Sequence, residues 1–246
     1  MEHVTEPTSR HPGPHLGLLA LVHVGLFSLG LWFVLSTRAA GGHFPRPWMP
    51  PEDIAAYFET HARDMVRCAF LQFGSAIPLG LFTATVASRL RFLGVRAAGA
   101  HIALFGGLMA AFDVALAALL LWAIAYPNAQ VVGVANDVGS VRSLFYTFFS
   151  VGSVGYSVPF GLLVVGVSVS AGAPKLIPRW LMTAGIAVAV CGETSWLALA
   201  DPRLSFLVPL TRVAGSSWMI VVGFVLPSSV PTGATPLATT EPQPAA

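Results

Sequence analysis

The sequence predicts an all-α, polytopic membrane protein built as a bundle of six transmembrane helices. Of its 246 residues, 55% are hydrophobic and only 10% are charged, and the mean hydropathy is +0.73. Soluble domains average about 25% charged residues, so this chain lacks the polar surface that a soluble domain needs. Six stretches reach the roughly 20 apolar residues that cross a hydrocarbon core. They run from about 15–37, 66–88, 99–125, 143–170, 178–199 and 206–226.

The breaks between the stretches define the domain organisation. Arginines interrupt the apolar pattern in the second gap, and an Asp-Pro-Arg sequence does so in the fifth. All gaps but the first are short, so consecutive helices should be antiparallel neighbours, and no loop has room for a catalytic domain. We expect one transmembrane domain over 15–227, preceded by a cytoplasmic tail over 1–14. The tail over 228–246 is rich in Pro, Ser, Thr and Ala, which predicts disorder.

The first gap, from about 38–65, is predicted to hold an amphipathic outer segment at about 51–65 that runs into the second span. Pro51 precedes Glu52 and Asp53, and a proline followed by acids is typical of the first turn of a helix. Apolar and aromatic residues then recur at helical spacing: Ile54, Tyr57, Phe58, His61 and Met65. We interpret this segment as a connector on the membrane surface; a lid over the bundle is the alternative.

The basic residues indicate the orientation. By count they divide evenly between the two sides of the membrane. With the N-terminus in the cytoplasm, however, the two short inner loops contain no acid, whereas the four arginines of the long outer gap are interleaved with four acids. We therefore expect both termini in the cytoplasm. The first span is longer than the roughly 7 to 15 apolar residues of a secretory signal, so we expect it to be retained.

Three charged residues lie inside the predicted spans: Asp113, Glu193 and Arg212. A charge at the bilayer centre costs about 2.5 to 3.5 kcal/mol on insertion scales, so such residues usually face the protein interior and mark a function. Asp113 shares its helix face with Gly106, Ala110 and Ala117, and Glu193 shares its face with Gly185 and Ala189. Such small residues permit close helix packing, so both acids should point into the bundle. Arg212 shares its face with Ser216, Met219 and Gly223.

The depth of the charges predicts which of them meet. At about 1.5 Å per residue, Glu193 and Arg212 both lie about 9 Å below the outer ends of their spans, and Asp113 lies about 18 Å deep. We expect Glu193 and Arg212 to pair, with Asp113 out of reach and protonated, because desolvation disfavours a charged carboxylate. The pair is interpreted in two ways. It is either a polar clamp that fixes helix register or, with Asp113, part of a cavity that binds a ligand or passes protons.

Two local patterns suggest sharper functions, and we interpret both as structural. The run from Ser153 to Tyr156 resembles the start of a potassium-channel filter, but it lies within an uninterrupted apolar stretch. Its glycines instead suit a packing face, bent at Pro159. His23 and His101 would have to face each other at one depth to hold haem, and His101 lies closer to the surface. We therefore expect no cofactor.

Other classes of function lack support in the sequence. The net charge is +2 and the basic residues form no stripe, so we expect no nucleic-acid partner. The two cysteines, Cys68 and Cys191, have no metal-ligand spacing, and we interpret them as apolar fillers. We expect no metal, because no zinc signature is present, and we find no phosphate-binding glycine loop or nucleophile elbow.

In whole-chain pattern the protein resembles an uncharacterised family of bacterial six-helix integral membrane proteins, a domain of unknown function. The resemblance lies in 73–93 and 101–125, in the Ile-Pro-Arg-Trp-Leu start of the fifth span at 177–181, and in 209–223 around Trp218. It implies a six-helix fold in a bacterial inner membrane. It carries over no functional residue.

Three functions fit these observations. The first is a non-enzymatic small-molecule binding or transport-like protein, with a polar cavity opening outward among the third, fifth and sixth spans. The second is a small intramembrane enzyme that acts on a lipid or quinone-type substrate, with Asp113 and Glu193 as acid and base. The third is an accessory subunit of a membrane complex, which would show an apolar groove without an enclosed cavity.

Overall fold

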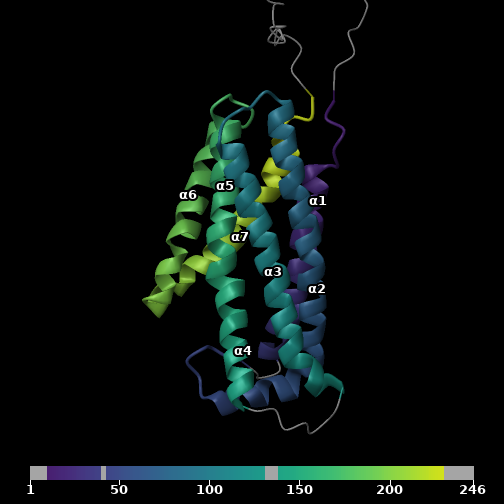
Figure 1. Ribbon diagram of the computed structural model, residues 1–246, viewed down its shortest axis with the longest axis vertical. Coiled ribbons are helices and arrows are strands. Elements are labelled where there is room, and N and C mark those ends of the chain that lie inside the picture. Colours follow the sequence, from purple (N-terminus) through teal and green to yellow (C-terminus); the bar gives the residue numbers. More distant parts are fainter. Residues whose placement is uncertain (1–9, 40–42, 131–137, 230–246) are drawn as a thin grey trace, which may run out of the picture.

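The computed structural model describes residues 10–39, 43–130 and 138–229, and in these ranges it is helical with no strand. Six helical segments in these ranges are long and apolar enough to cross a membrane, which confirms the predicted fold class. Their order along the chain is shown in Figure 1. The α-helices are α1 (Leu16–Ala39), α2 (Pro51–Phe92), α3 (Gly99–Gln130), α4 (Val138–Ser150), α5 (Tyr156–Gly172), α6 (Arg179–Thr194) and α7 (Leu207–Val225).

The fourth span is interrupted between α4 and α5 by a π-helical turn, η1 (Val151–Gly155). Pro159 lies four residues after Gly155 and has no N–H, so it cannot donate to the Gly155 carbonyl as an α-helix requires. The irregularity thus falls in the turn before this proline. Two short 3₁₀ helices, η2 (Ser195–Leu199) and η3 (Pro202–Phe206), join α6 to α7.

Both ends of the described chain lie at the same end of the bundle, as an even number of spans requires (Figure 1). Arg10 and Ser229 form an isolated antiparallel bridge, and the His11 N–H donates to the Ser228 carbonyl at 2.8 Å. The His11 ring accepts from the Gly13 N–H through Nδ1. Burial and the nearby Arg89 lower the pKa of His11, which favours the neutral ring that this hydrogen bond needs. The rest of the two predicted tails, 1–9 and 230–246, lies outside the described residues.

The predicted outer segment at about 51–65 is the first part of α2. Backbone angles leave the helical region at His61 (φ −111°, ψ 17°), and the part before this kink lies across the lower end of the bundle in Figure 1. Ile54, Phe58 and Met65 are fully buried in a cluster with residues of α3 and α4, such as Leu121. The segment therefore covers this end of the bundle, as the lid interpretation expects, and it runs across the bundle axis, as a connector on the membrane surface also would.

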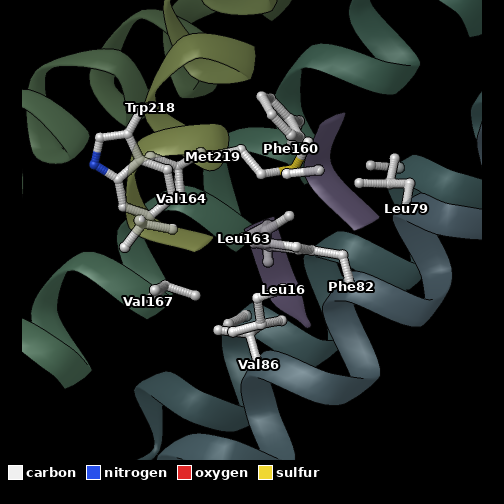
Figure 2. Close-up of a cluster of buried hydrophobic side chains, with 14 of the residues drawn as sticks. Leu16, Leu79, Phe82, Val86, Phe160, Leu163, Val164, Val167, Trp218 and Met219 are labelled. Carbon is white, nitrogen blue, oxygen red and sulfur yellow. The ribbon is translucent and has the colours of Figure 1, made fainter. Parts of the chain in front are cut away.

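A second and larger cluster fills the other half of the molecule. Figure 2 shows side chains of α1, α2, α5 and α7 converging there. The one polar atom of Trp218, Nε1, donates to the Leu181 carbonyl at 2.8 Å, so this buried indole is satisfied. Large apolar side chains such as Phe70 and Trp32 point outward instead, at 76% and 63% exposure, as expected of a surface that faces lipid.

Small residues bring the helices of the bundle into backbone contact. A methyl group added to Gly106 of α3 would lie 2.5 Å from the Pro159 carbonyl oxygen, and one added to Gly192 of α6 would lie 2.8 Å from the Ser157 carbonyl oxygen. Ala110, Asp113 and the rest of that predicted α3 face are buried. The inward faces predicted from small-residue spacing on α3 and α6 are thus confirmed.

Candidate ligand-binding cavity

A cavity of about 550 Å³ is lined by residues of both hydrophobic clusters. Its walls come from α1, α2, α3, α4, η1 and α7, with η2, η3 and the segment before α2 around its mouth. On α1 the lining runs from Phe27 to Val34, and on α3 from Val114 to Leu121. Seven residues of helix cover about 10 Å. The cavity is therefore an elongated space along the bundle axis.

The walls of the cavity are mostly apolar and aromatic. Residues such as Phe27, Phe148 and Leu121 line it, and a few uncharged polar groups such as Gln72 and Ser153 interrupt them. Among the described lining residues Arg212 is the single charged one, and none is acidic. Pockets of about 300 to 1,000 Å³ with apolar walls and few polar groups are typical of small-molecule sites.

Arg212 is held in place by the π turn and by two aromatic rings. Its Nη2 donates to the Gly152 carbonyl oxygen. Its guanidinium carbon lies 4.7 Å from the ring centroid of Phe27 and 4.7 Å from that of Tyr156, both within cation–π range. A π turn breaks the regular i to i+4 hydrogen bonding of a helix, and Arg212 supplies a donor to a carbonyl in that turn.

The predicted ion pair between Glu193 and Arg212 is not formed. Within the described ranges the one salt bridge joins Arg67 and Asp64, at 3.1 Å on the surface. Glu193 instead faces α5, where a methyl group added to Gly161 would lie 3.0 Å from its Oε1. The two residues have similar depth, but the inner face of α6 packs on α5 while Arg212 points from α7 toward α1 and η1. Depth alone does not fix the direction in which a side chain points.

Asp113 also faces the fourth span and lies outside the cavity lining. A methyl group added to Gly155 would lie 3.7 Å from the Asp113 carboxyl carbon. The side chain is 9% exposed, and in the described part of the chain it makes neither a hydrogen bond nor an ion pair. The three predicted polar-core residues thus do not form one site. Asp113, Glu193 and Arg212 contact the same span at three different glycines, and only Arg212 reaches the cavity.

The two histidines considered for haem are far apart. His23 is buried, and its Nδ1 donates to the Ser75 carbonyl on α2 at 2.8 Å. His101 is exposed and contacts Arg91, 16 residues further along the same helix, which is about 24 Å at 1.5 Å per residue. They cannot ligate one haem. No group of three His, Cys, Asp or Glu side chains placed to hold a metal occurs among the described residues.

The mouth of the cavity lies between the segment before α2 and η3. Trp48 and Leu199 line this end and are 58% and 68% exposed. A second hollow adjoins it and shares Trp48 and Pro202 with it, and this hollow is lined by Arg46 and Arg203 as well. The sequence indicated none of these cavity residues except Arg212.

The cavity thus offers a long apolar surface with one cation inside it and two more at its mouth. Cys68, which lines one wall, is buried and not in a disulfide. No carboxylate in the lining is placed to act as an acid or base on a bound molecule. Comparisons of this protein with protein-family models, with curated proteins and with solved structures find no match.

Proposed function

We propose that this multi-pass membrane protein binds a small amphiphilic molecule and acts as a non-enzymatic binding or transport-like protein. One observation carries the proposal: the cavity of about 550 Å³, with apolar walls and a single guanidinium inside. Its volume is in the range of ligand pockets, and its walls suit a molecule with an alkyl or aromatic body. A molecule of this kind dissolves in the bilayer and is therefore available in the lipid around the bundle.

Two alternatives have less support. The enzymatic one requires Asp113 and Glu193 to meet around one substrate, and both lie outside the cavity lining, against different glycines. An accessory subunit would present an apolar surface groove to its partner, whereas this cavity extends about 10 Å along the bundle axis. The placement of the charged residues therefore favours binding over catalysis.

The proposed orientation places both termini in the cytoplasm of a bacterial cell, with the cavity mouth on the outer side of the inner membrane. The basic inner loops support it, and the common end of Arg10 and Ser229 is consistent with it.

In a Cys191→Ser background, where Cys68 is buried, Glu59→Cys should react with an impermeant maleimide in intact cells, because residue 59 is exposed at the outer end. Arg91→Cys, exposed at the other end, should react only after permeabilisation. The reverse pattern would invert the topology.

Filling the cavity should abolish binding. Ala198 lines the cavity and is partly exposed, so a tryptophan there should occupy the space with little strain on the fold. We expect Ala198→Trp to reduce saturable labelling of the cavity peptides at least tenfold. The probe is dodecanol with a terminal diazirine, the protein is held in phosphatidylcholine nanodiscs, and mass spectrometry locates the labelled peptides.

The matched control is Ala200→Trp, two residues away, where the side chain is exposed and outside the cavity lining. It should be labelled as strongly as the parent. Equal labelling of the parent and Ala198→Trp, or an equal loss in both variants, would contradict binding in this cavity.

A further inference from the structure

We propose that the ligand is a single-chain anionic amphiphile whose oxyanion binds Arg212 at the deep end of the cavity. This inference rests on the proposed function and names the chemistry of its ligand. A carboxylate and a phosphate monoester share the required group, because both present oxygens that accept the paired N–H groups of a guanidinium.

The first argument is that Arg212 has an uncompensated charge. No carboxylate lies within 4 Å of it in the described part of the chain, and the acids of neighbouring spans, Asp113 and Glu193, face other glycines. A charge in the membrane interior pairs with another charge or with backbone carbonyls. Arg212 has the Gly152 carbonyl, but no described side chain provides an anion to balance its charge.

The second argument concerns its hydrogen bonds. A guanidinium has five N–H donors. The Gly152 carbonyl takes one from Nη2, and Nη1 has no acceptor among the described residues. Nε also lacks an acceptor, but it is enclosed by the protein, so the donors left for a ligand are those of the two Nη atoms. The rings of Phe27 and Tyr156 lie 4.7 Å from the guanidinium carbon and accept no strong hydrogen bond. The open donors therefore call for an oxygen-rich anion, which a neutral alcohol or a cation does not supply.

The third argument concerns the direction of the ligand. Arg212 contacts Phe27, at one end of the α1 lining, while Val34, Phe44 and Trp48 line the other end about 10 Å away. An alkyl chain that extends from an anion at Arg212 would run along these apolar walls to the mouth. Arg46 and Arg203 stand at that mouth and raise the local concentration of anions there. The cavity thus fits a ligand that enters with its anion leading.

The test uses the photoreactive dodecanol of the previous section and unlabelled competitors in neutral phosphatidylcholine nanodiscs. For the parent, dodecanoate or dodecyl phosphate should block labelling at concentrations at least tenfold lower than dodecanol. Dodecyltrimethylammonium should be no better than dodecanol. Preference for one of the two anions over the other tells a fatty carboxylate from a lipid phosphate.

Arg212→Gln should reduce the anion preference to less than twofold while dodecanol still competes, and Arg212→Lys, which keeps the charge, should retain part of it. Arg179→Gln, exposed on α6 at the other end of the bundle, is the control and should match the parent. If Arg212→Gln does not fold, the competition series on the parent and on Arg212→Lys decides.

Two results would overturn the inference directly: equal competition by anion and alcohol in the parent, or an undiminished anion preference in Arg212→Gln. A third would place the anion at the mouth instead: the double variant Arg46→Gln with Arg203→Gln loses the anion preference while Arg212→Gln keeps it. These outcomes are separate from a failure of the proposed function. If the dodecanol probe labels no cavity peptide of the parent, binding itself is wrong. If it labels them without an advantage for anions, only the ligand class is wrong.

Discussion

Gly106→Val should leave little folded protein. The added Cβ would lie 2.5 Å from the Pro159 carbonyl oxygen and 2.8 Å from the Leu163 nitrogen, and both are backbone atoms of a packed helix that cannot move aside. Overpacking a core typically costs about 1 to 3 kcal/mol, and we expect the upper end of this range or more, because α3 would have to separate from α5. The measurement is the monodisperse fraction in size-exclusion chromatography and the melting temperature in detergent.

Gly25→Val on α1 is the matched control, because nothing lies within 4 Å of a Cβ at this position. Both changes put a β-branched residue inside a helix, so any effect of helix propensity is shared. The control should melt within a few degrees of the parent. If it loses as much folded protein as Gly106→Val, the contact between α3 and α5 is not the cause.

Glu193→Gln and Arg212→Gln should act independently on stability. Arg212→Gln removes the charged donor to the Gly152 carbonyl and two cation–π contacts, and we expect a loss of about 2 to 3 kcal/mol. Glu193→Gln should change stability by less than about 1 kcal/mol, because the glutamate has no cationic partner among the described residues and the amide keeps its shape. The double variant should lose the sum of the two, within about 0.5 kcal/mol.

The alternative outcome is specific. Were the two residues an ion pair in the membrane, each single change would leave an uncompensated charge, and the double variant would recover much of the loss. Melting temperatures of the four proteins in one detergent distinguish the two cases. Recovery in the double variant would mean that Glu193 and Arg212 meet, contrary to the structure.

The sequence predicted the spans and the inward faces well, because both depend on properties of a single helix. Apolar length gives the span, and small residues at helical spacing give the face, as for Gly106 and Asp113 on α3. The contacts between two helices cannot be predicted from one helix alone. Residue counts place Glu193 and Arg212 at one depth, but which neighbour each face meets depends on how the whole bundle packs, and α5 takes the contact with Glu193.

The π turn and the position of the cavity were not predicted, for a related reason. The sequence suggested a polar cavity among the third, fifth and sixth spans, whereas the observed cavity is mostly apolar and lies mainly among the first four spans and the sixth. The sequence suggested a bend at Pro159, whereas the irregularity lies in the preceding turn, at Val151–Gly155. A cavity is space that side chains of several helices fail to fill, and no periodic pattern in one helix marks such a space. Arg212 was the one residue in the sequence that pointed to this cavity, because a charged residue in an apolar stretch indicates a functional site.

The π turn also sets the phase of the fourth span. A turn that closes from i to i+5 contains one residue more than an α-helical turn, and one residue corresponds to about 100° of rotation. The side chains of α4 are therefore rotated about the helix axis by about 100° from where an unbroken helix continued from α5 would place them. With this rotation, the aromatic residues Tyr146, Phe148 and Phe149 of α4 line one wall of the cavity. Deleting one residue from Val151–Gly155 would swing these rings away from the cavity while α5 kept its packing, so the shape of the binding site depends on the length of a five-residue turn.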